Sequence, residues 1–180
     1  MHNLLLAVLL AVTWSADPVH SSANFTVTHL GISHVNGIIP IKSSNIDVPE
    51  GSNIPASADA VFDPSGVDTR NNDRDSDLRS PHFFEVATYP MMSFKSTKIT
   101  ATDATHFTMT GDLTLHGQTH PVTLDAQYLG RTTTPNGQQR IAYEAKTTID
   151  RTQWGMTYGN PFAGNSVDIE LDIEAVRISR

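Results

Sequence analysis

The stretch His106-Phe-Thr-Met-Thr-Gly-Asp-Leu-Thr-Leu115 decides the fold class of this chain. Apolar residues and one glycine occupy every second position, and polar residues fill the positions between them. Because successive side chains of a β-strand point to opposite faces, this period of two predicts a strand with one face in a core and the other in water. Strands of this kind are typical of antiparallel sheets.

The same alternation extends outward in both directions. It recurs in residues 24–29, 54–62, 122–128 and 167–174, and an apolar run at residues 32–41 is a further strand that ends near Pro40. We count about eight strands without an internal repeat or a linker, and 180 residues suit a single domain. Such strands bury their apolar faces in a sandwich or a barrel. The long final strands favour an all-β fold, an extended antiparallel β-barrel whose bore can hold one ligand.

The composition excludes several classes of protein. A net charge of −7 argues against nucleic-acid binding, because contacts with phosphates need a basic surface. The chain has no cysteine, which excludes disulfides, thiolate nucleophiles and cysteine zinc sites.

Residues 4–12 form an uninterrupted apolar run of nine residues. This is too short to span a bilayer, which takes about 20 residues, but it fits the hydrophobic region of a signal peptide. We therefore expect no stable membrane span, and we interpret the segment as the remnant of a signal peptide. A signal peptide would place the protein in the periplasm or outside the cell. The alternative is a first strand or a helix packed on the barrel.

Residues 68–90 differ from the alternating segments around them. Residues 68–85 hold eight of the 31 charged residues. Asn71 or Asn72 can cap the start of a helix, the order of Asp75 and Arg79 favours an i,i+4 pair on its surface, and Pro81 ends it. The segment is therefore predicted to be a short helical insertion between the third and fourth strands.

Phe83 and Phe84 stand side by side after this helix. A charged outer face combined with two aromatic side chains on the inner face fits a lid over an apolar opening. The alternative is that the two rings only plug one end of the barrel.

The histidines and acids do not form a catalytic or metal-binding pattern. His116 and His120 flank a reversal, so their spacing of four residues does not predict a zinc site as it would on a helix, and His29 and His34 are five residues apart. The acids at residues 168–174 alternate with an apolar row and form the solvated face of a strand. There is no Gly-x-Ser-x-Gly elbow and no phosphate-binding glycine loop. We predict no catalytic residue, metal or cofactor, with an enzyme acting on a lipid-like substrate as the alternative.

The apolar interior is the remaining candidate site. Its inward rows have almost no polar anchors, so they would select a long hydrocarbon over a sugar or a nucleotide. With the lid, the candidate ligand-binding residues are Phe25, Val27, Phe83, Phe84, Phe94, Phe107, Met109, Leu113, Leu124, Ile169 and Leu171. The alternative is that these side chains fill a packed core, as in a stress-response protein without a ligand.

Six motifs resemble the YceI-like family of bacterial polyisoprenoid-binding proteins, and they occur in the expected order. They are Trp14-Ser-Ala-Asp-Pro-Val-His-Ser21, Phe25-Thr-Val-Thr-His-Leu-Gly-Ile-Ser33, Asn71-Asn-Asp-Arg-Asp-Ser-Asp-Leu-Arg-Ser80, Phe83-Phe-Glu-Val-Ala-Thr-Tyr-Pro90, Gly111-Asp-Leu-Thr-Leu-His-Gly117 and Asp150-Arg-Thr-Gln-Trp-Gly155. The resemblance implies a lipocalin-like barrel over residues 14–180, preceded at residues 1–13 by the signal-peptide remnant or apolar segment.

The resemblance also implies export to the periplasm, no established catalytic activity, and an isoprenoid or other long-chain lipid as partner, such as a quinone tail. Asp77 stands where the helix of the family usually carries His. The sequence leaves open whether the chain forms a homodimer.

Overall fold

The computed structural model describes residues 11–178, and this part of the chain forms ten strands, one α-helix and two short 3-10 helices. The strands are β1 Ala11–Ala16, β2 Ser22–His29, β3 Ser33–Ile39, β4 Ile41–Pro49, β5 Ser57–Phe62, β6 Met92–Ala101, β7 His106–Leu115, β8 Gln118–Thr133, β9 Gln139–Asp150 and β10 Ala163–Arg177. The helices are α1 Asn72–Arg79, η1 Pro64–Gly66 and η2 Arg151–Trp154. Within the described residues, no helix is long and apolar enough to cross a membrane.

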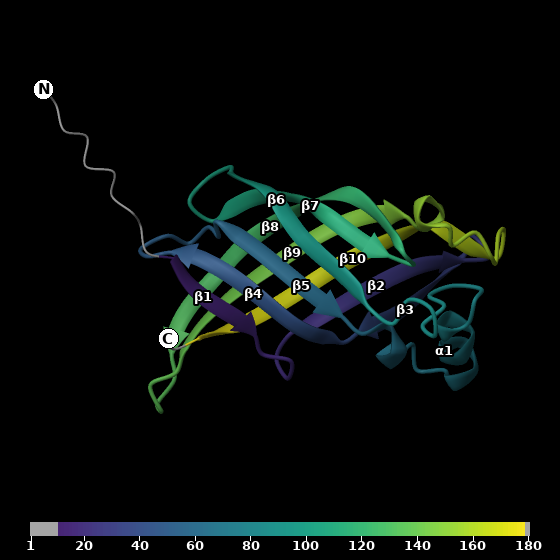
Figure 1. Cartoon of the computed structure of the whole chain (residues 1–180), viewed down its shortest axis with the longest axis horizontal. Helices are drawn as coiled ribbons and strands as arrows, with labels where there is room; N and C mark the ends of the chain where they lie inside the picture. The colour runs from purple at the N-terminus through teal and green to yellow at the C-terminus, as the bar shows by residue number, and fades with distance from the viewer. Residues whose placement is uncertain (1–10, 179–180) are drawn as a thin grey trace, which may run out of the picture.

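The strands form one antiparallel sheet that closes on itself (Figure 1). Hydrogen bonding follows the order β1-β4-β5-β6-β7-β8-β9-β10, and β10 pairs back onto β1. β2 continues the path of β1 along β10, and β3 leads into β4 after Pro40. The ten strands therefore make a closed barrel of eight strands in circumference, which confirms the predicted fold.

The two ends of the barrel differ. At one end, β1 joins β4 and β10 by backbone hydrogen bonds. At the other end, β3 pairs with β2 along one edge and makes only a single bridge, from Ile38 to Asp68, along the other. The segment that contains α1 lies beside this edge (Figure 1). The predicted helical insertion is confirmed and lies between β5 and β6.

The end that is closed by β1 is a packed core. Trp14, Val48, Phe107, Ile141 and Ala175 are all almost completely buried there and belong to one cluster. Large side chains from opposite walls meet in this half of the bore, so they leave little room for a ligand.

One strand of the N-terminal half was not predicted. β4 follows directly after Pro40, in a segment to which no strand was assigned. β1 begins at Ala11 and therefore includes the last two residues of the apolar run, for which a first strand was the alternative interpretation. Residues 1–10, which contain most of the apolar run, lie outside the described residues.

The lid helix begins as predicted but uses one acid differently. The Asn71 side chain caps α1 by accepting a hydrogen bond from the Arg74 backbone N–H at 2.9 Å. Asp75 is buried and accepts hydrogen bonds from the backbone N–H and the hydroxyl of Thr69, at 2.9 and 2.5 Å. The predicted surface pair of Asp75 with Arg79 is therefore wrong, because this carboxylate holds the incoming loop instead.

Candidate functional site

The half of the barrel beside α1 contains a cavity of about 710 Å³. Ligand cavities in proteins commonly range from about 300 to 1,000 Å³. Its wall consists mainly of apolar side chains from the inner faces of β2, β6, β7, β9 and β10 and from the lid segment, residues 68–90. Tyr158 and Phe162 line the cavity and are also exposed on the surface, so the cavity reaches solvent at this end.

Two inward-facing glycines keep the bore open. Phe25 pairs directly across from Gly37, and a Cβ built on Gly37 would lie only 2.4 Å from the Phe25 Cζ. In the same way, a Cβ on Gly111 would lie 2.4 Å from the Phe94 Cζ. Each ring therefore lies against the wall in the space that a side chain would occupy, and this leaves the centre of the bore free.

The lid places both of its phenylalanines against the cavity. Phe84 lines the cavity and packs against two core clusters, which include Trp154 and Phe62 respectively. Phe83 lines the cavity and packs edge-on against Tyr158, with ring centroids 5.7 Å apart. Both side chains that were predicted to form the lid therefore line the cavity.

Aromatic stacking joins the lid to the loop that precedes β10. His82 stacks on Tyr158 with ring centroids 3.8 Å apart and an interplanar angle of 5°. Asp77, the residue that departs from the family pattern, lies 2.6 Å from the His82 Nδ1 through its Oδ1. The lid and this loop therefore meet at the mouth of the cavity.

Arg151 is the main polar group in the wall that the sequence analysis missed. Only 4% of it is exposed, and it lines the cavity. Its guanidinium donates hydrogen bonds to three backbone carbonyls, those of Met156 at 2.5 Å, Gly164 at 2.9 Å and Ala163 at 3.0 Å. Its Cζ lies 5.7 Å from the centre of the Phe83 ring.

The charge of Arg151 is not neutralised by direct contact. Among residues 11–178 it forms no ion pair with a carboxylate. Burial lowers its pKa, and the nearby Asp150 carboxylate opposes that shift. An arginine still keeps its proton at neutral pH. The three carbonyls leave two of its five N–H groups without a partner among these bonds, and the wall of the mainly apolar cavity therefore contains a cation.

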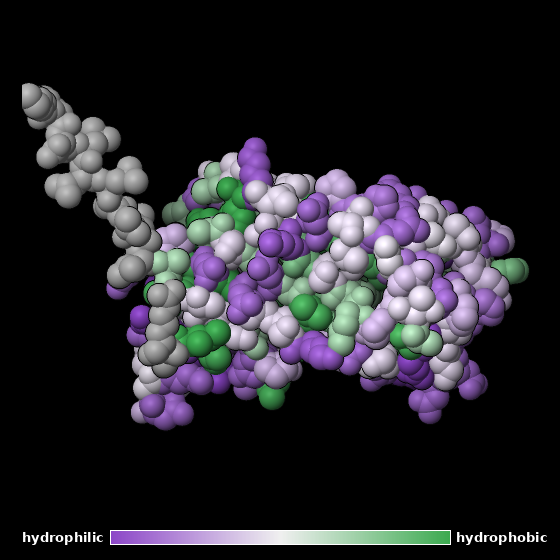
Figure 2. Space-filling view, in the orientation of Figure 1, coloured by the Kyte–Doolittle hydropathy of each residue, from purple (hydrophilic) through white to green (hydrophobic). Residues whose placement is uncertain are grey.

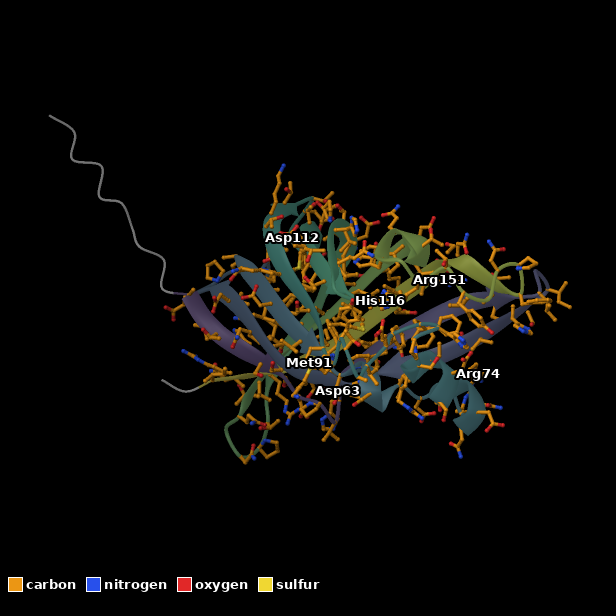
Figure 3. The ribbon with its side chains drawn as sticks, turned by 45° about the vertical axis from the view of Figure 1, so that its right-hand side comes forward. Asp63, Arg74, Met91, Asp112, His116 and Arg151 are labelled. Carbon is orange, nitrogen blue, oxygen red and sulfur yellow. The ribbon has the colours of Figure 1, made fainter. Side chains whose placement is uncertain are left out.

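Arg74 and Asp77 also line the cavity. Arg74 is used within the lid, because it donates to the hydroxyl and to the backbone carbonyl of Thr69, both at 2.8 Å. Figure 3 shows Arg74 and Arg151 toward the α1 end of the barrel, with Asp112 farther along it. Arg151 is buried whereas Arg74 is only partly buried, so Arg151 is the cation that the cavity wall encloses.

The structure divides the predicted ligand-binding residues into two groups. Nine line the large cavity: Phe25, Val27, Phe83, Phe84, Phe94, Leu113, Leu124, Ile169 and Leu171. Phe107 and Met109 line a separate space of about 90 Å³ nearer the closed end. Residues such as Met156, Tyr158 and Phe162 line the cavity from a loop without alternation, so no periodic signal could have found them.

His116 and His120 do not form a metal site. The His116 Nδ1 lies 2.9 Å from the Trp154 carbonyl oxygen, and the His120 ring packs edge-on against the Trp154 ring. The His116 Nε2 faces the lid, 3.4 Å from a carboxylate oxygen of Glu85. Both histidines therefore support the loop around Trp154 rather than converge on a common point.

Two clusters of acidic residues on the outside of the barrel each bind a cationic side chain of the protein. Asp17 and Glu174 both bind Arg140, and His20 lies beside Asp17. Lys146 lies between Glu144 and Glu170, with Nζ–O distances of 2.5 and 2.9 Å. These contacts raise the pKa of Lys146. The acids therefore balance neighbouring cations on the protein surface.

A closed eight-stranded barrel with an apolar cavity under an aromatic lid defines a lipocalin-like protein. Residues 14–175 match the YceI-like domain, and the chain belongs to that family. It is 33% identical over 160 residues to a UPF0312 protein of Vibrio parahaemolyticus, an alignment that covers 88% of this chain and 82% of the relative.

Solved structures show the same fold. The Campylobacter jejuni YceI protein is 26% identical, with a TM-score of 0.71 over 84% of this chain and 90% of the other. A polyisoprenoid-binding domain from Saccharophagus degradans is 14% identical, with a TM-score of 0.69 over 93% of this chain and 99% of that domain.

Proposed function

We propose that this protein binds a long-chain isoprenoid or a similar amphiphilic lipid in the barrel without transforming it, for carriage, storage or protection. The observation that carries the proposal is the cavity of about 710 Å³, which is walled mainly by apolar side chains and lined at one end by Phe83 and Phe84. Each buried methylene group contributes about 0.8 kcal/mol, so a flexible hydrocarbon chain can bind there through its length alone. The polyisoprenoid-binding description of the Saccharophagus degradans domain supports the same class of ligand.

Arg151 supports a finer assignment of the ligand. A buried guanidinium in an apolar wall favours a lipid with an acceptor oxygen at one end, such as a quinone carbonyl or a phosphate. Hydrogen bonds to charged groups contribute roughly 1.5–3 kcal/mol, or about 10- to 100-fold in affinity. The proposed arrangement has the hydrocarbon tail in the bore and the oxygen-bearing end at Arg151.

Export is part of the proposal and is supported by the apolar run at residues 4–12. A cleavage within Ala11–Ala16 would remove β1, which pairs with both β4 and β10. The proposed location is the periplasm or the outside of the cell.

The direct test is organic extraction of protein purified without detergent, followed by mass spectrometry. We expect a long-chain lipid in stoichiometric amount. Recovery of polar metabolites alone, together with failure of the purified protein to bind added prenylquinone, would contradict the proposal.

A matched pair of ligands tests the role of Arg151. Squalene offers an isoprenoid chain without oxygen, whereas a prenylated benzoquinone adds two carbonyls to a similar chain. We expect Arg151→Met to weaken quinone binding by about 10- to 100-fold relative to squalene binding measured on the same variant. Because both ligands meet the same altered wall, any general distortion of the barrel cancels in this ratio. An unchanged ratio would show that Arg151 serves only to hold the loop that precedes β10.

A further inference from the structure

Four exposed side chains surround the mouth of the cavity. Leu30 and Ile32 lie on the β2–β3 turn, Tyr158 and Phe162 lie on the loop before β10, and together they are called the apolar rim below. The Leu30 backbone N–H donates to the Phe162 carbonyl at 2.8 Å, which places the turn beside the loop. Ile32 is 86% exposed and Phe162 is 61% exposed. Figure 2 shows a hydrophobic projection at the end of the molecule where Figure 1 places this turn.

The two segments that form the apolar rim contain no permanently charged residue. Asp, Glu, Lys and Arg are absent from residues 18–41 and from residues 152–167, although 31 such residues occur in the chain. The titratable groups within the two segments are histidines, of which His29 and His34 lie beside the turn, together with Tyr158. A surface of this kind can enter an apolar medium without the large cost of removing charges from water.

Leu30 is an unexpected residue at its position, because the backbone there has a positive φ angle. Leu30 and Gly31 have φ angles of 53° and 70°, and the Ile32 N–H donates to the His29 carbonyl at 3.2 Å. Turns whose two central residues both have positive φ angles favour Asn-Gly at these positions, because a leucine strains the backbone in this region. Packing inside the protein does little to offset that strain, since 51% of Leu30 is exposed. Backbone strain of this kind clusters at functional sites of proteins.

We propose that the apolar rim docks onto the surface of a lipid bilayer, so that the mouth of the cavity faces the membrane when lipid enters or leaves. Tyr158 and Phe162 belong to both the rim and the cavity wall, so the docked surface is continuous with the interior. A bilayer suits the rim better than a charged partner does, because the rim offers apolar side chains and no ion-pairing group. The purpose of docking rests on the proposed lipid-binding function, but the contact itself can be measured separately.

The test compares two double variants by co-sedimentation with phosphatidylcholine vesicles. Leu30→Asn with Ile32→Ser removes two rim side chains that do not line the cavity, and asparagine suits the backbone at position 30. The matched control is Leu129→Asn with Val19→Ser, which removes apolar side chains of comparable exposure, 54% and 81%, outside the rim. We expect the rim variant to lose vesicle binding by roughly tenfold or more, with unchanged thermal stability, and the control to bind like the wild type.

Three results would overturn the docking proposal: no vesicle binding by the wild type, equal loss in both double variants, or unchanged binding by the rim variant. Sedimentation velocity supplies one more check. If the rim variant changes a dimer into a monomer while vesicle binding persists, the rim is an interface between copies of the chain.

Lipid content separates this proposal from the proposed function. A rim variant that still carries extracted lipid but exchanges it with vesicles more slowly supports both proposals. If no preparation contains or takes up lipid, while the rim variant alone loses vesicle binding, docking stands and the lipid-carrying function fails.

Discussion

Replacement of Gly37 by alanine tests whether the glycines in the wall keep the bore open. The new Cβ would lie 2.4 and 2.6 Å from two ring carbons of Phe25, and 2.8 Å from the Thr69 Cγ2. Carbon atoms in contact lie about 3.5–4.0 Å apart, so the edge of the Phe25 ring must retreat by about 1 Å, toward the cavity that it lines. All three close atoms belong to side chains, so the strands can stay paired while the side chains move.

The expected energies follow from this geometry. Overpacking of a well-filled site costs about 1–3 kcal/mol in the free energy of unfolding. If the displaced ring excludes one methylene group of the lipid, about 0.8 kcal/mol of binding is lost, which is about a fourfold weaker affinity. Gly37→Ala should therefore lower both stability and lipid affinity.

A compensating background makes the test specific. Phe25→Leu removes the ring, and Thr69→Ser removes the methyl group while it keeps the hydroxyl that Asp75 and Arg74 bind. This background removes the three atoms nearest to the new Cβ of Gly37→Ala, and alanine in a strand is about 0.5–1 kcal/mol more stable than glycine. The effect of the substitution should thus change sign, from destabilising in the wild type to stabilising in the double variant. Urea denaturation of the four proteins measures this coupling, and equal effects of Gly37→Ala in the two backgrounds would refute the reasoning.

Three further predictions concern the lid and the loops. Phe83→Ser should speed lipid release into acceptor vesicles with little change in urea midpoint. Phe84→Ser should speed release and also lower the urea midpoint, because only Phe84 packs into two core clusters as well; equal release rates for wild type and Phe83→Ser would disprove the lid. Asp75→Ala leaves the two Thr69 donors buried without an acceptor and should cost roughly 2–4 kcal/mol by urea denaturation, and a cost near zero would show that water replaces the carboxylate. Backbone N–H groups lower the pKa of Asp103 in the folded state. The stabilising effect of this carboxylate is therefore present above about pH 4, the pKa range of the unfolded chain, and is lost as the pH falls toward the folded-state pKa. Asp103→Asn should flatten this acid dependence of the melting temperature, and parallel curves for the wild type and the variant would show that Asp103 does not cause it.

Strand alternation made much of the fold predictable. In β7 and β10 one inward row is apolar and one outward row is polar, so the period of two was sufficient to place both strands and their faces. The Asn71 cap was equally readable, because the chemistry of a helix N-terminus is local.

β4 escaped prediction because its inward row is not apolar throughout. Ser44 is buried and accepts a hydrogen bond from the Ala16 N–H at 2.7 Å. The pairing with β5 also shifts register between Ile41 and Ser43, which interrupts the period of two at the start of the strand. The sequence therefore carries a polar, irregular pattern where the barrel needs a strand, and only the strands on either side reveal it.

Asp75 and Arg151 show a different limit of sequence reasoning. The i,i+4 spacing of Asp75 and Arg79 is the usual sign of a surface ion pair, yet the carboxylate turns toward a loop that precedes the helix. Arg151 follows the end of a strand and binds carbonyls 5 to 13 residues farther along the chain. In both cases a charged side chain forms hydrogen bonds with backbone groups, and the positions of those groups cannot be predicted from the pattern of side-chain types.

The position of the cavity was the hardest feature to predict, because the inward rows look alike in both halves of the barrel. Phe107 faces Tyr143 edge-on, with ring centroids 6.0 Å apart, and this half of the bore is filled. Phe25 and Phe94 are the same residue type on the same kind of row, yet the ring edge of each lies over a glycine and the bore beside it stays open. What distinguishes a packed half from a hollow half is therefore the residue beneath or opposite each ring. An inward-facing glycine beside an aromatic residue on the neighbouring strand marks the hollow half: Gly37 pairs directly with Phe25, and Gly111 pairs with Ser96, two residues along the strand from Phe94.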